Sequence, residues 1–375
     1  MAQSGILIVG GGIAGLTLAA ALRQRGFQVD LIEQKSALSD GGGIGLTLVG
    51  NALRALDQIG VAEACVEAGM PADSMAICRP DGTIVAENPL PRIGGPQWPG
   101  GTGIRRAALH AILVEAARGA GVSIRCDTTM SDWSDRGDDV EVTFSDGSRS
   151  CYALVVGADG LYSATREKLM PQLRPALTGQ VVWRAEAARP PEVRRTHLHL
   201  GGPHGVVGIC PVSEELAYVY IVAAAPDNPW RDPATLHLQM REALTGYGGL
   251  VAELAETLDR SEKVSYRPLE WLMAPRPWGR GRVVLIGDAV HANPPVLAQG
   301  AAMAIEDAIV LADELVQSGG AADVALPRFL DRRFDRSAAV VEASCALARA
   351  EVEHRQDLDV PAVMRAATLM LAEAI

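Results

Sequence analysis

The chain has 375 residues, of which 48% are hydrophobic and 21% charged, and its formal net charge is −11 at pH 7. A chain of this length exceeds the size at which one core usually stops growing, so we expect two domains, and its apolar content excludes a disordered protein. The negative charge and the scattered arginines disfavour nucleic acid as a partner, because phosphate binding needs clustered Lys and Arg.

The first predicted element pair is a compact βαβ half-unit. A continuous apolar run at Ile6–Val9 predicts a strand that is buried on both faces, as in a parallel sheet. Three glycines follow it, and helical periodicity then runs from Ile13 to Arg25, where Gly26 closes the helix. A second apolar strand, Val29–Ile32, ends at Glu33 and completes the unit.

The middle of the chain alternates helices with hairpins. The predicted elements are, in order, a helix at 51–56, a hairpin at 77–85, a Pro- and Gly-rich loop at 87–103, a helix at 106–118, a strand at 122–125, and a hairpin with arms 140–144 and 149–156. The second arm of that hairpin runs into Gly157-Ala158-Asp159-Gly160.

From about residue 178 the pattern changes to short strands with no helix between them. The predicted strands are 181–185, 197–200, 206–209 and 217–222, which indicate an antiparallel sheet, and a helix follows around 236–258. His197 and His199 alternate with two leucines, and by the usual burial pattern we expect the leucines inside and both histidines in solvent. A buried strand at 283–286 and a helix at 300–315 then return the chain to the first domain.

These elements predict an α/β fold with α+β elements: a Rossmann-like nucleotide-binding domain, a β-sheet substrate domain and C-terminal helices. We assign residues 1–70, 98–176 and 267–325 to the first domain, 71–97 and 177–266 to the β-rich domain, and 326–375 to helices packed on the body.

The six cysteines lie far apart, with no metal-ligand spacing, so we expect reduced, mostly buried thiols and no metal site. No run of about 18 apolar residues free of charge appears, and residues 1–4 lack the basic segment of a signal peptide. We therefore expect no membrane span and a cytoplasmic location.

The triple Gly10-x-Gly12-x-x-Gly15 predicts a dinucleotide site because its context is right. A buried strand precedes it, a helix follows, and Glu33 stands where an acid that binds ribose belongs. The glycines allow close approach of the backbone, and the helix N-terminus offers free N–H groups to a pyrophosphate. A tight βα turn that binds no ligand is the alternative.

Two later segments make the prediction more specific. Residues 155–166 read VVGADGLYSATR, and residues 287–300 read GDAVHANPPVLAQG, followed by MAIEDA at 303–308. Together with the glycine triple, they resemble the FAD-dependent aromatic-hydroxylase family, the single-component flavoprotein monooxygenases that act on 4-hydroxybenzoate, salicylate, 3-hydroxybenzoate and pyridine rings. The matching motifs span residues 6 to about 315.

The chemistry of the second segment can also be argued without the family. Asp288 follows a strand, and its carboxylate can accept hydrogen bonds from sugar-alcohol hydroxyls. The helix that begins near Gly300 points positive N–H groups at an anionic ring edge, such as that of reduced flavin.

The resemblance implies bound FAD, NAD(P)H as reductant and hydroxylation by O2 through a flavin C4a-hydroperoxide. Arg106, which opens a helix, and Asp159 would contact FAD, and Pro295 would border the reacting face of the flavin ring. His291 is implied to be structural rather than catalytic. The full set of residues expected to bind the cofactor is Gly10, Gly12, Ile13, Ala14, Gly15, Glu33, Arg106, Asp159, Asp288, Gln299, Gly300 and Ala301.

The sequence indicates less clearly which residues contact the substrate. Tyr218, seven residues after Pro211, resembles a substrate-contacting tyrosine of pyridine-ring oxygenases, although it could equally serve ordinary strand packing. Those relatives also carry an arginine that anchors a carboxylate, but the nearest position here is Val206, which weakens the case for a carboxylate substrate. The pair Trp183-Arg184 is expected to be architectural. The base, if any, the choice between NADH and NADPH, and a monomer or homodimer stay open.

Two other classes compete with a hydroxylase of a small aromatic or heteroaromatic substrate. A flavin-dependent oxidase or another non-hydroxylating flavoenzyme could use the same fold. A halogenase is disfavoured, because its Trp-x-Trp-x-Ile-Pro element does not occur here. A non-catalytic nucleotide binder is disfavoured by the 287–300 segment, since a binder has no need to hold a flavin ring.

Overall fold

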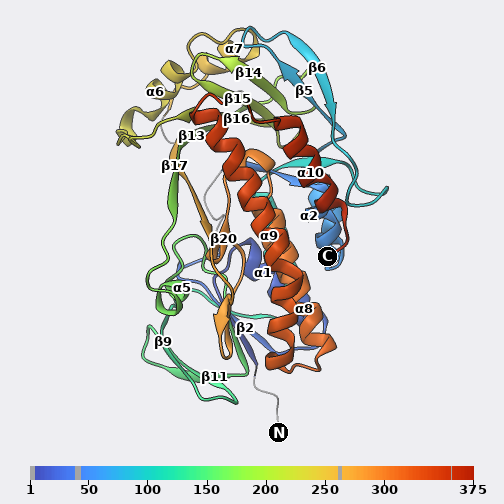
Figure 1. The fold of residues 1–375 in the computed structure, drawn as a ribbon, viewed down its shortest axis with the longest axis vertical. Coiled ribbons are helices and arrows are strands. Elements are labelled where there is room, and N and C mark those ends of the chain that lie inside the picture. The colour runs from blue at the N-terminus through green and yellow to red at the C-terminus, as the bar shows by residue number, and fades with distance from the viewer. Residues whose placement is uncertain (1–4, 39–43, 261–263, 356) are drawn as a thin grey trace.

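The computed structural model describes residues 5–38, 44–260, 264–355 and 357–375 (Figure 1). A six-stranded sheet in the order β18-β19-β12-β1-β2-β8 forms the centre of one half of the molecule. All neighbours from β19 to β8 are parallel, and only β18 runs antiparallel to its neighbour. The strands are β1 (Ile6–Val9), β2 (Val29–Ile32), β8 (Ser123–Arg125), β12 (Leu154–Gly157), β18 (Gly279–Arg280) and β19 (Val283–Leu285).

Both faces of this sheet are covered, which is why its strands are continuous apolar runs. Ile6 and Ile8 of β1 join the large core made with the helices, whereas Leu7 and Val9 pack against a small antiparallel sheet. The strands of that sheet are β9 (Met130–Asp135), β10 (Val140–Phe144) and β11 (Arg149–Tyr152).

An eight-stranded sheet in the order β20-β17-β13-β16-β15-β14-β5-β6 forms the other half of the molecule. All its neighbours are antiparallel except β14 and β5. Its strands are β5 (Ser74–Cys78), β6 (Ile84–Pro89), β13 (Ala176–Ala188), β14 (His197–Gly202), β15 (Gly205–Pro211), β16 (Leu216–Ala224), β17 (Val264–Met273) and β20 (His291–Ala292). A third sheet joins β3 (Gly45–Val49), β7 (Gly101–Arg105) and β4 (Met70–Ala72).

The helices pack against the two sheets. Figure 1 shows α8 and α9 side by side, with α9 reaching from the parallel sheet to β13 and β17 of the larger sheet. The helices are α1 (Ile13–Gln24), α2 (Gly50–Asp57), α3 (Ala62–Glu67), α4 (Arg106–Gly119), α5 (Ala164–Leu169), α6 (Leu236–Ala243), α7 (Leu250–Glu256), α8 (Gly300–Gln317), α9 (Ala322–Val352) and α10 (Val360–Ala372), with short 3-10 turns at 233–235, 287–289 and 295–297. The predicted α/β fold with a second, antiparallel sheet and C-terminal helices is confirmed.

Several local predictions were wrong. The segment 87–103 is not all loop, because β6 extends to Pro89 and β7 begins at Gly101. The arm 149–156 is two strands in different sheets, β11 and β12. The helix expected at 236–258 is two helices, separated by a turn in which Gly246 and Gly249 have φ of +87° and +55°. The domain limit at residue 266 stays a prediction; β17 spans it, from Val264 to Met273.

The expectation for the histidines of β14 is also wrong. His197 and His199 are 6% and 1% exposed, and Leu200 is 40% exposed. The histidines lie on the face of the sheet that α6 and α7 cover, where the His199 Nδ1 atom lies 3.2 Å from the carbonyl oxygen of Arg79. Helices remote in sequence therefore reverse the burial that local alternation predicted.

Of the six cysteines, three are buried, two are partly exposed and Cys151 is exposed. Among the residues described, none of the helices combines the length and the apolar character needed to cross a membrane.

Candidate functional site

Three motifs far apart in the sequence meet at the carboxyl ends of three adjacent parallel strands, β1, β12 and β19. The Ile286 amide donates to the Gly157 carbonyl at 3.0 Å, which holds the second and third strand ends together. A Cβ added to Gly10 would lie 2.5 Å from the Ala158 oxygen, and one added to Gly287 would lie 3.3 Å from the Ala14 Cβ. This is the edge of an open α/β sheet at which ligands bind.

Each glycine of the triple has its own physical role. Gly10 has φ of +111°, which a residue with a side chain rarely adopts. A Cβ on Gly15 would lie 2.0 Å from the Gly10 oxygen, so only glycine lets α1 pack this closely on the turn. Gly12 is exposed, and a Cβ there would meet nothing within 4 Å, so this position opens onto free space.

The start of α1 fits a phosphate group. The helix has no side-chain cap and no acidic residue in its first turn, so its first N–H groups keep no side-chain partner. Ile13 and Ala14, the first two helical residues, are buried and hold this end against the core. Free N–H groups beside the space at Gly12 form the kind of site that binds a pyrophosphate.

Glu33 lies at the end of β2 beside the glycine turn. Its carboxylate accepts hydrogen bonds from the Gly11 amide at 2.8 Å and the Lys35 amide at 3.0 Å. His110, which the sequence analysis missed, is buried, and its Nε2 atom lies 2.8 Å from the Gly11 carbonyl oxygen. The available signal was its spacing of four residues from Arg106, which places both side chains on one side of α4.

Asp159 lies beside Gly10 but uses its carboxylate within its own segment. It accepts hydrogen bonds from the Ser163 hydroxyl at 2.5 Å and from the Thr165 amide and hydroxyl, both at 2.9 Å. These bonds fix the start of α5. A contact between Asp159 and the cofactor stays a prediction.

Asp288 and Arg106 are the two charged side chains at this site without a direct partner. Neither side chain makes a hydrogen bond or an ion pair within the described ranges, 5–38, 44–260, 264–355 and 357–375. Asp288 is exposed, yet the protein around it raises the pKa of its carboxyl by desolvation, against the opposing charges of His291 and Arg106. An accessible carboxylate and guanidinium at the end of a nucleotide-binding sheet suit the hydroxyls and ring edge of FAD.

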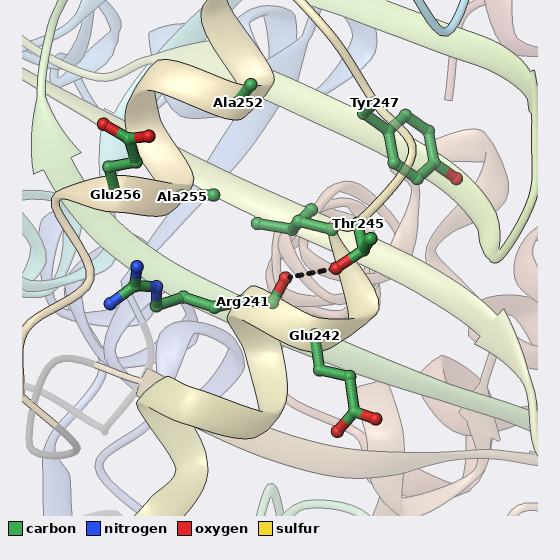
Figure 2. Close-up of a pocket in the computed structure, with 8 residues that line it drawn as sticks. Arg241, Glu242, Thr245, Tyr247, Ala252, Ala255 and Glu256 are labelled. Carbon is green, nitrogen blue, oxygen red and sulfur yellow. Dashed lines mark hydrogen bonds between the residues drawn. The ribbon is translucent and has the colours of Figure 1, made fainter.

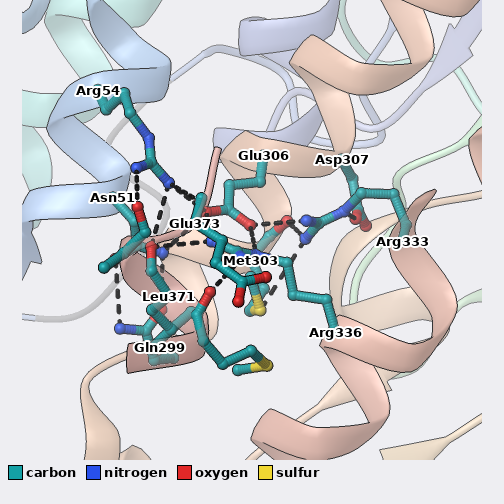
Figure 3. A network of polar contacts seen from close by, with 12 residues as sticks. Asn51, Arg54, Gln299, Met303, Glu306, Asp307, Arg333, Arg336, Leu371 and Glu373 are labelled. Carbon is teal, nitrogen blue, oxygen red and sulfur yellow. Dashed lines mark hydrogen bonds and ion pairs between the residues drawn. The ribbon is translucent and has the colours of Figure 1, made fainter. Parts of the chain in front are cut away.

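A buried polar network of α8 and α9 lies next to the Asp288 loop, and Figure 3 shows its members Glu306, Asp307 and Arg333. Asp307 accepts hydrogen bonds from the Gly287 amide at 2.9 Å and from Arg333 Nε at 2.7 Å, and its Oδ2 atom lies 2.6 Å from His291 Nε2. Burial would raise the pKa of Asp307, but His291 and Arg333 lower it to about 2. Glu306 binds Arg333 at 2.6 Å and Arg336 at 2.9 Å. His291 thus occupies a buried structural position.

The Pro295 to Ala301 segment completes this side of the site. Pro295 is exposed at the start of a 3-10 turn, and α8 begins at Gly300 with no side-chain cap and no acid in its first turn. Gln299 is 3% exposed, and its side-chain amide exchanges hydrogen bonds of 3.0 and 3.3 Å with that of Asn51. Its side chain therefore holds α2 to α8, while the backbone from Gly300 to Ala301 presents the free N–H groups.

The large sheet turns one face toward the nucleotide-binding half. Trp183 joins the core with α6 and α7, so Arg184, its neighbour on β13, lies on the opposite face with Tyr218 and Tyr220 of β16. The two tyrosine rings are 5.5 Å apart between centroids, with 30° between their planes. A Cβ on Gly45 would lie 2.5 Å from the Tyr218 ring, so β3 packs directly on it. Trp183 lies in the core, in agreement with an architectural role, and the role of Arg184 stays a prediction.

Desolvation raises the pKa of Tyr218 well above that of a free phenol. A raised pKa favours the protonated phenol, which can both donate and accept a hydrogen bond.

A separate surface depression lies between α6 and α7 (Figure 2). Two of its polar groups are used locally: Thr245 donates to the Arg241 carbonyl at 3.4 Å, and Tyr247 donates to the Gly205 carbonyl at 2.7 Å. These two helices cover the Trp183 face of the sheet, so the depression is separate from the motif residues.

Comparison with known proteins agrees with this geometry. A family model described as an FAD binding domain matches residues 3–344. The 3-amino-4-hydroxybenzoate 2-monooxygenase PtmB3 of Streptomyces platensis is 35% identical over 352 residues, which cover 88% of this chain and 84% of that protein. The 2-heptyl-3-hydroxy-4(1H)-quinolone synthase of Pseudomonas aeruginosa (strain UCBPP-PA14) is 34% identical over 309 residues, covering 82% and 79%.

Among solved structures, Klebsiella pneumoniae HpxO complexed with FAD and uric acid has the same fold, with a TM-score of 0.83 at 23% identity over 99% of this chain and 93% of that one. The matched family model covers nearly the whole chain and includes all three motifs that meet at the strand ends. The chain therefore belongs to the FAD-binding-domain family of FAD-dependent monooxygenases and is an oxidoreductase.

Proposed function

We propose that the protein uses NAD(P)H and O2 to hydroxylate a small aromatic or heteroaromatic substrate at bound FAD. The observation that carries the proposal is the meeting of the glycine turn, the Asp288 loop and the start of α8 beside a sheet face that bears Tyr218. Relatives support the substrate class, because PtmB3 is named for a hydroxybenzoate and the Pseudomonas enzyme for a quinolone.

The residues present fit FAD, because each chemical group of the cofactor has a suitable binding partner in the protein. The free N–H groups of α1 at Gly12 would bind the pyrophosphate, and Glu33 would bind a ribose hydroxyl. Asp288 would bind the sugar-alcohol chain, and the uncapped start of α8 would face the ring edge that becomes anionic on reduction. When bound, FAD would supply the redox chemistry, with NAD(P)H as the reductant and O2 as the source of the inserted oxygen.

The chain's own residues position the substrate and exclude water. Pro295, exposed on a stiff turn before α8, would border the ring where reaction occurs. Tyr218 would hold a polar substituent of the substrate by a hydrogen bond, in its protonated form. The packed Tyr218 and Tyr220 rings would give a planar substrate an apolar wall and limit access of water.

The experiment measures NAD(P)H oxidation by the FAD-loaded protein with and without phenols, hydroxybenzoates and hydroxyquinolines, and then follows ¹⁸O₂ into the product. We expect ring-dependent oxidation and one labelled oxygen in the product. NAD(P)H oxidation that yields only hydrogen peroxide with every ring would refute the proposal and favour an oxidase.

Tyr218→Phe tests the site in the same assay. We expect kcat/KM to fall about tenfold, the scale of one lost hydrogen bond, with FAD content unchanged. Tyr162→Phe is the matched control, because Tyr162 is 73% exposed and its hydroxyl donates to Glu270. Equal effects of the two changes would remove Tyr218 from the proposed site.

A further inference from the structure

Gln180 is a buried polar side chain on the sheet face that bears Tyr218. Strand alternation places it opposite Trp183, which faces the core under α6 and α7. Gln180 is 2% exposed, and among the residues that the structure describes its Oε1 atom has no hydrogen-bond partner. Because buried polar atoms are normally hydrogen-bonded, this oxygen indicates a donor that the chain itself does not supply.

The side-chain amide of Gln180 donates from Nε2 to the carboxylate of Glu351 on α9, at 2.9 Å. Glu351 is only partly exposed, and within the described part of the chain it makes no other hydrogen bond and no ion pair. Desolvation raises the pKa of Glu351, against the opposing effects of the Gln180 bond and the charge of His354. The two oxygens left without a partner, one on each side chain, are both acceptors.

The position of Glu351 on α9 relates it to the proposed site. One end of this helix face lies at the flavin loop, where Asn293 Nδ2 is 3.5 Å from Ser344 Oγ, next to Pro294 and Pro295. Glu351 follows Ser344 by seven residues, which is two turns along the same side of the helix, or about 10 Å. The segment that would border the flavin and the Glu351 carboxylate therefore lie at two ends of one helix face.

The sheet beside Glu351 offers an apolar surface for a ring. Val182, Val222 and Leu269 form a cluster with Tyr220 on the face of Gln180, and Val182 is the next residue of β13 on that face. Burial is the main cause of the raised pKa of Tyr220, and the negative charge of Glu351 adds to it. The carboxylate thus acts on the tyrosine that packs against Tyr218.

We infer that Glu351 is a specificity-determining residue that accepts a hydrogen bond from a donor group, a ring N–H or a ring hydroxyl, on the side of the aromatic substrate remote from the flavin. The inference rests on the proposed function and narrows its substrate class to rings that carry such a donor. Gln180 would hold the carboxylate in place and offer its free Oε1 atom as a second acceptor. An analogue without the donor would leave both oxygens unpaired, which is how a polar site rejects it.

The test measures ligand affinity of the FAD-loaded protein by calorimetry, with pairs of similar shape that differ in the donor. One arm uses 4-quinolones against chromones, in which oxygen replaces the ring N–H, and the other uses hydroxyquinolines against fluoroquinolines. For at least one pair we expect the wild type to bind the donor member about tenfold or more tightly, the usual worth of a hydrogen bond to a charged group. The arm that responds distinguishes an N–H from a hydroxyl.

Glu351→Gln should lose most of this preference, because the amide has the same shape but no charge and can donate as well as accept. Glu342→Gln is the matched control, since Glu342 is exposed on the same helix and its replacement should leave the preference intact. If Glu351→Gln does not yield folded holoenzyme, Gln180→Met replaces it, because that change removes one acceptor and the hydrogen bond that holds the other. It should also weaken the preference.

Three results would overturn the inference. They are a wild type with no preference for the donor in either arm, a variant at Glu351 or Gln180 that discriminates as the wild type does, and an equal loss in Glu342→Gln. The second result would leave the Gln180–Glu351 bond with the purely structural role of joining α9 to β13.

Failure of the proposed function looks different. If the wild type hydroxylates rings with and without a donor equally well and binds them equally, the inference fails and the proposed function stands. If no ring increases NAD(P)H oxidation or gains labelled oxygen, the proposed function fails, and the inference fails with it.

Discussion

Replacing Arg333 by methionine should destabilise the protein far more than any exposed arginine on the same helix. Arg333 is fully buried and donates to Asp307 at 2.7 Å, to Glu306 at 2.6 Å and to the Met303 carbonyl at 3.2 Å (Figure 3). Removing one partner of a buried ion pair typically costs about 3–5 kcal/mol, because the remaining charge is left buried without compensation. Here the lower end, about 3 kcal/mol, is expected, since Arg336 still binds Glu306 and His291 still lies beside Asp307.

The measurement is urea unfolding of the apoprotein, followed by tryptophan fluorescence and far-ultraviolet circular dichroism. Arg328→Met is the control on α9, because Arg328 is exposed and an exposed change typically alters stability by less than about 0.5 kcal/mol. Arg333→Met should also bind FAD more weakly, since Asp307 holds the Gly287 amide next to Asp288. If both variants unfold at the same urea concentration, buried charge does not support this site and the reasoning is wrong.

Three further predictions concern the cofactor site and pH. Gly15→Ala should lower the melting temperature of the apoprotein, because its Cβ would lie 2.0 Å from the Gly10 oxygen. Gly12→Ala should leave that temperature unchanged and weaken only FAD binding, which an FAD titration measures. Asp288→Ala should weaken FAD binding by about tenfold or more, the worth of a hydrogen bond to a charged group, in the same titration. Asp307, whose pKa is lowered to about 2, should contribute about 2 kcal/mol of stability above pH ~4, and this contribution should be lost as the pH falls toward 2. In acid unfolding curves, the difference in stability between the wild type and Asp307→Asn should therefore narrow over that range.

The nucleotide-binding half could be predicted because its signals are local. Ile6–Val9, the glycine turn and the Asp288 loop each carry their pattern within a few residues, and the parallel topology brings them to one edge. The second sheet was predicted as a sheet, but the arrangement of its faces was not. His197 is buried by helices about 40 residues further along the chain, which period-two alternation cannot reveal.

The positions of Arg333 and Arg184 could not be predicted from the sequence for the same reason. Arg333 lies in a helix with several other arginines, so the sequence alone predicts an exposed charge. Its partners Asp307 and Glu306 lie 26 and 27 residues earlier in the chain. Arg184 is adjacent to Trp183 in the sequence, but only Trp183 lies in the core under α6 and α7, and Arg184 lies on the opposite face of the sheet. In both cases the decisive fact is which face of an element is covered, and that depends on contacts between distant segments.

The C-terminal helices are best understood as part of the cofactor site's support. Arg336 of α9 binds Glu306 and also donates to the carbonyls of Met370 and Leu371 at the end of α10. Arg333 joins Glu306 to Asp307, whose carboxylate accepts from the Gly287 amide next to Asp288. A chain of buried and partly buried hydrogen bonds therefore runs from α10 to the Asp288 loop. A charge that is fully compensated in the interior gains little net stability, but it fixes geometry, since each member has only one arrangement that satisfies all its partners. We therefore expect variants of this network to alter how firmly FAD is held before they alter what the bound flavin does.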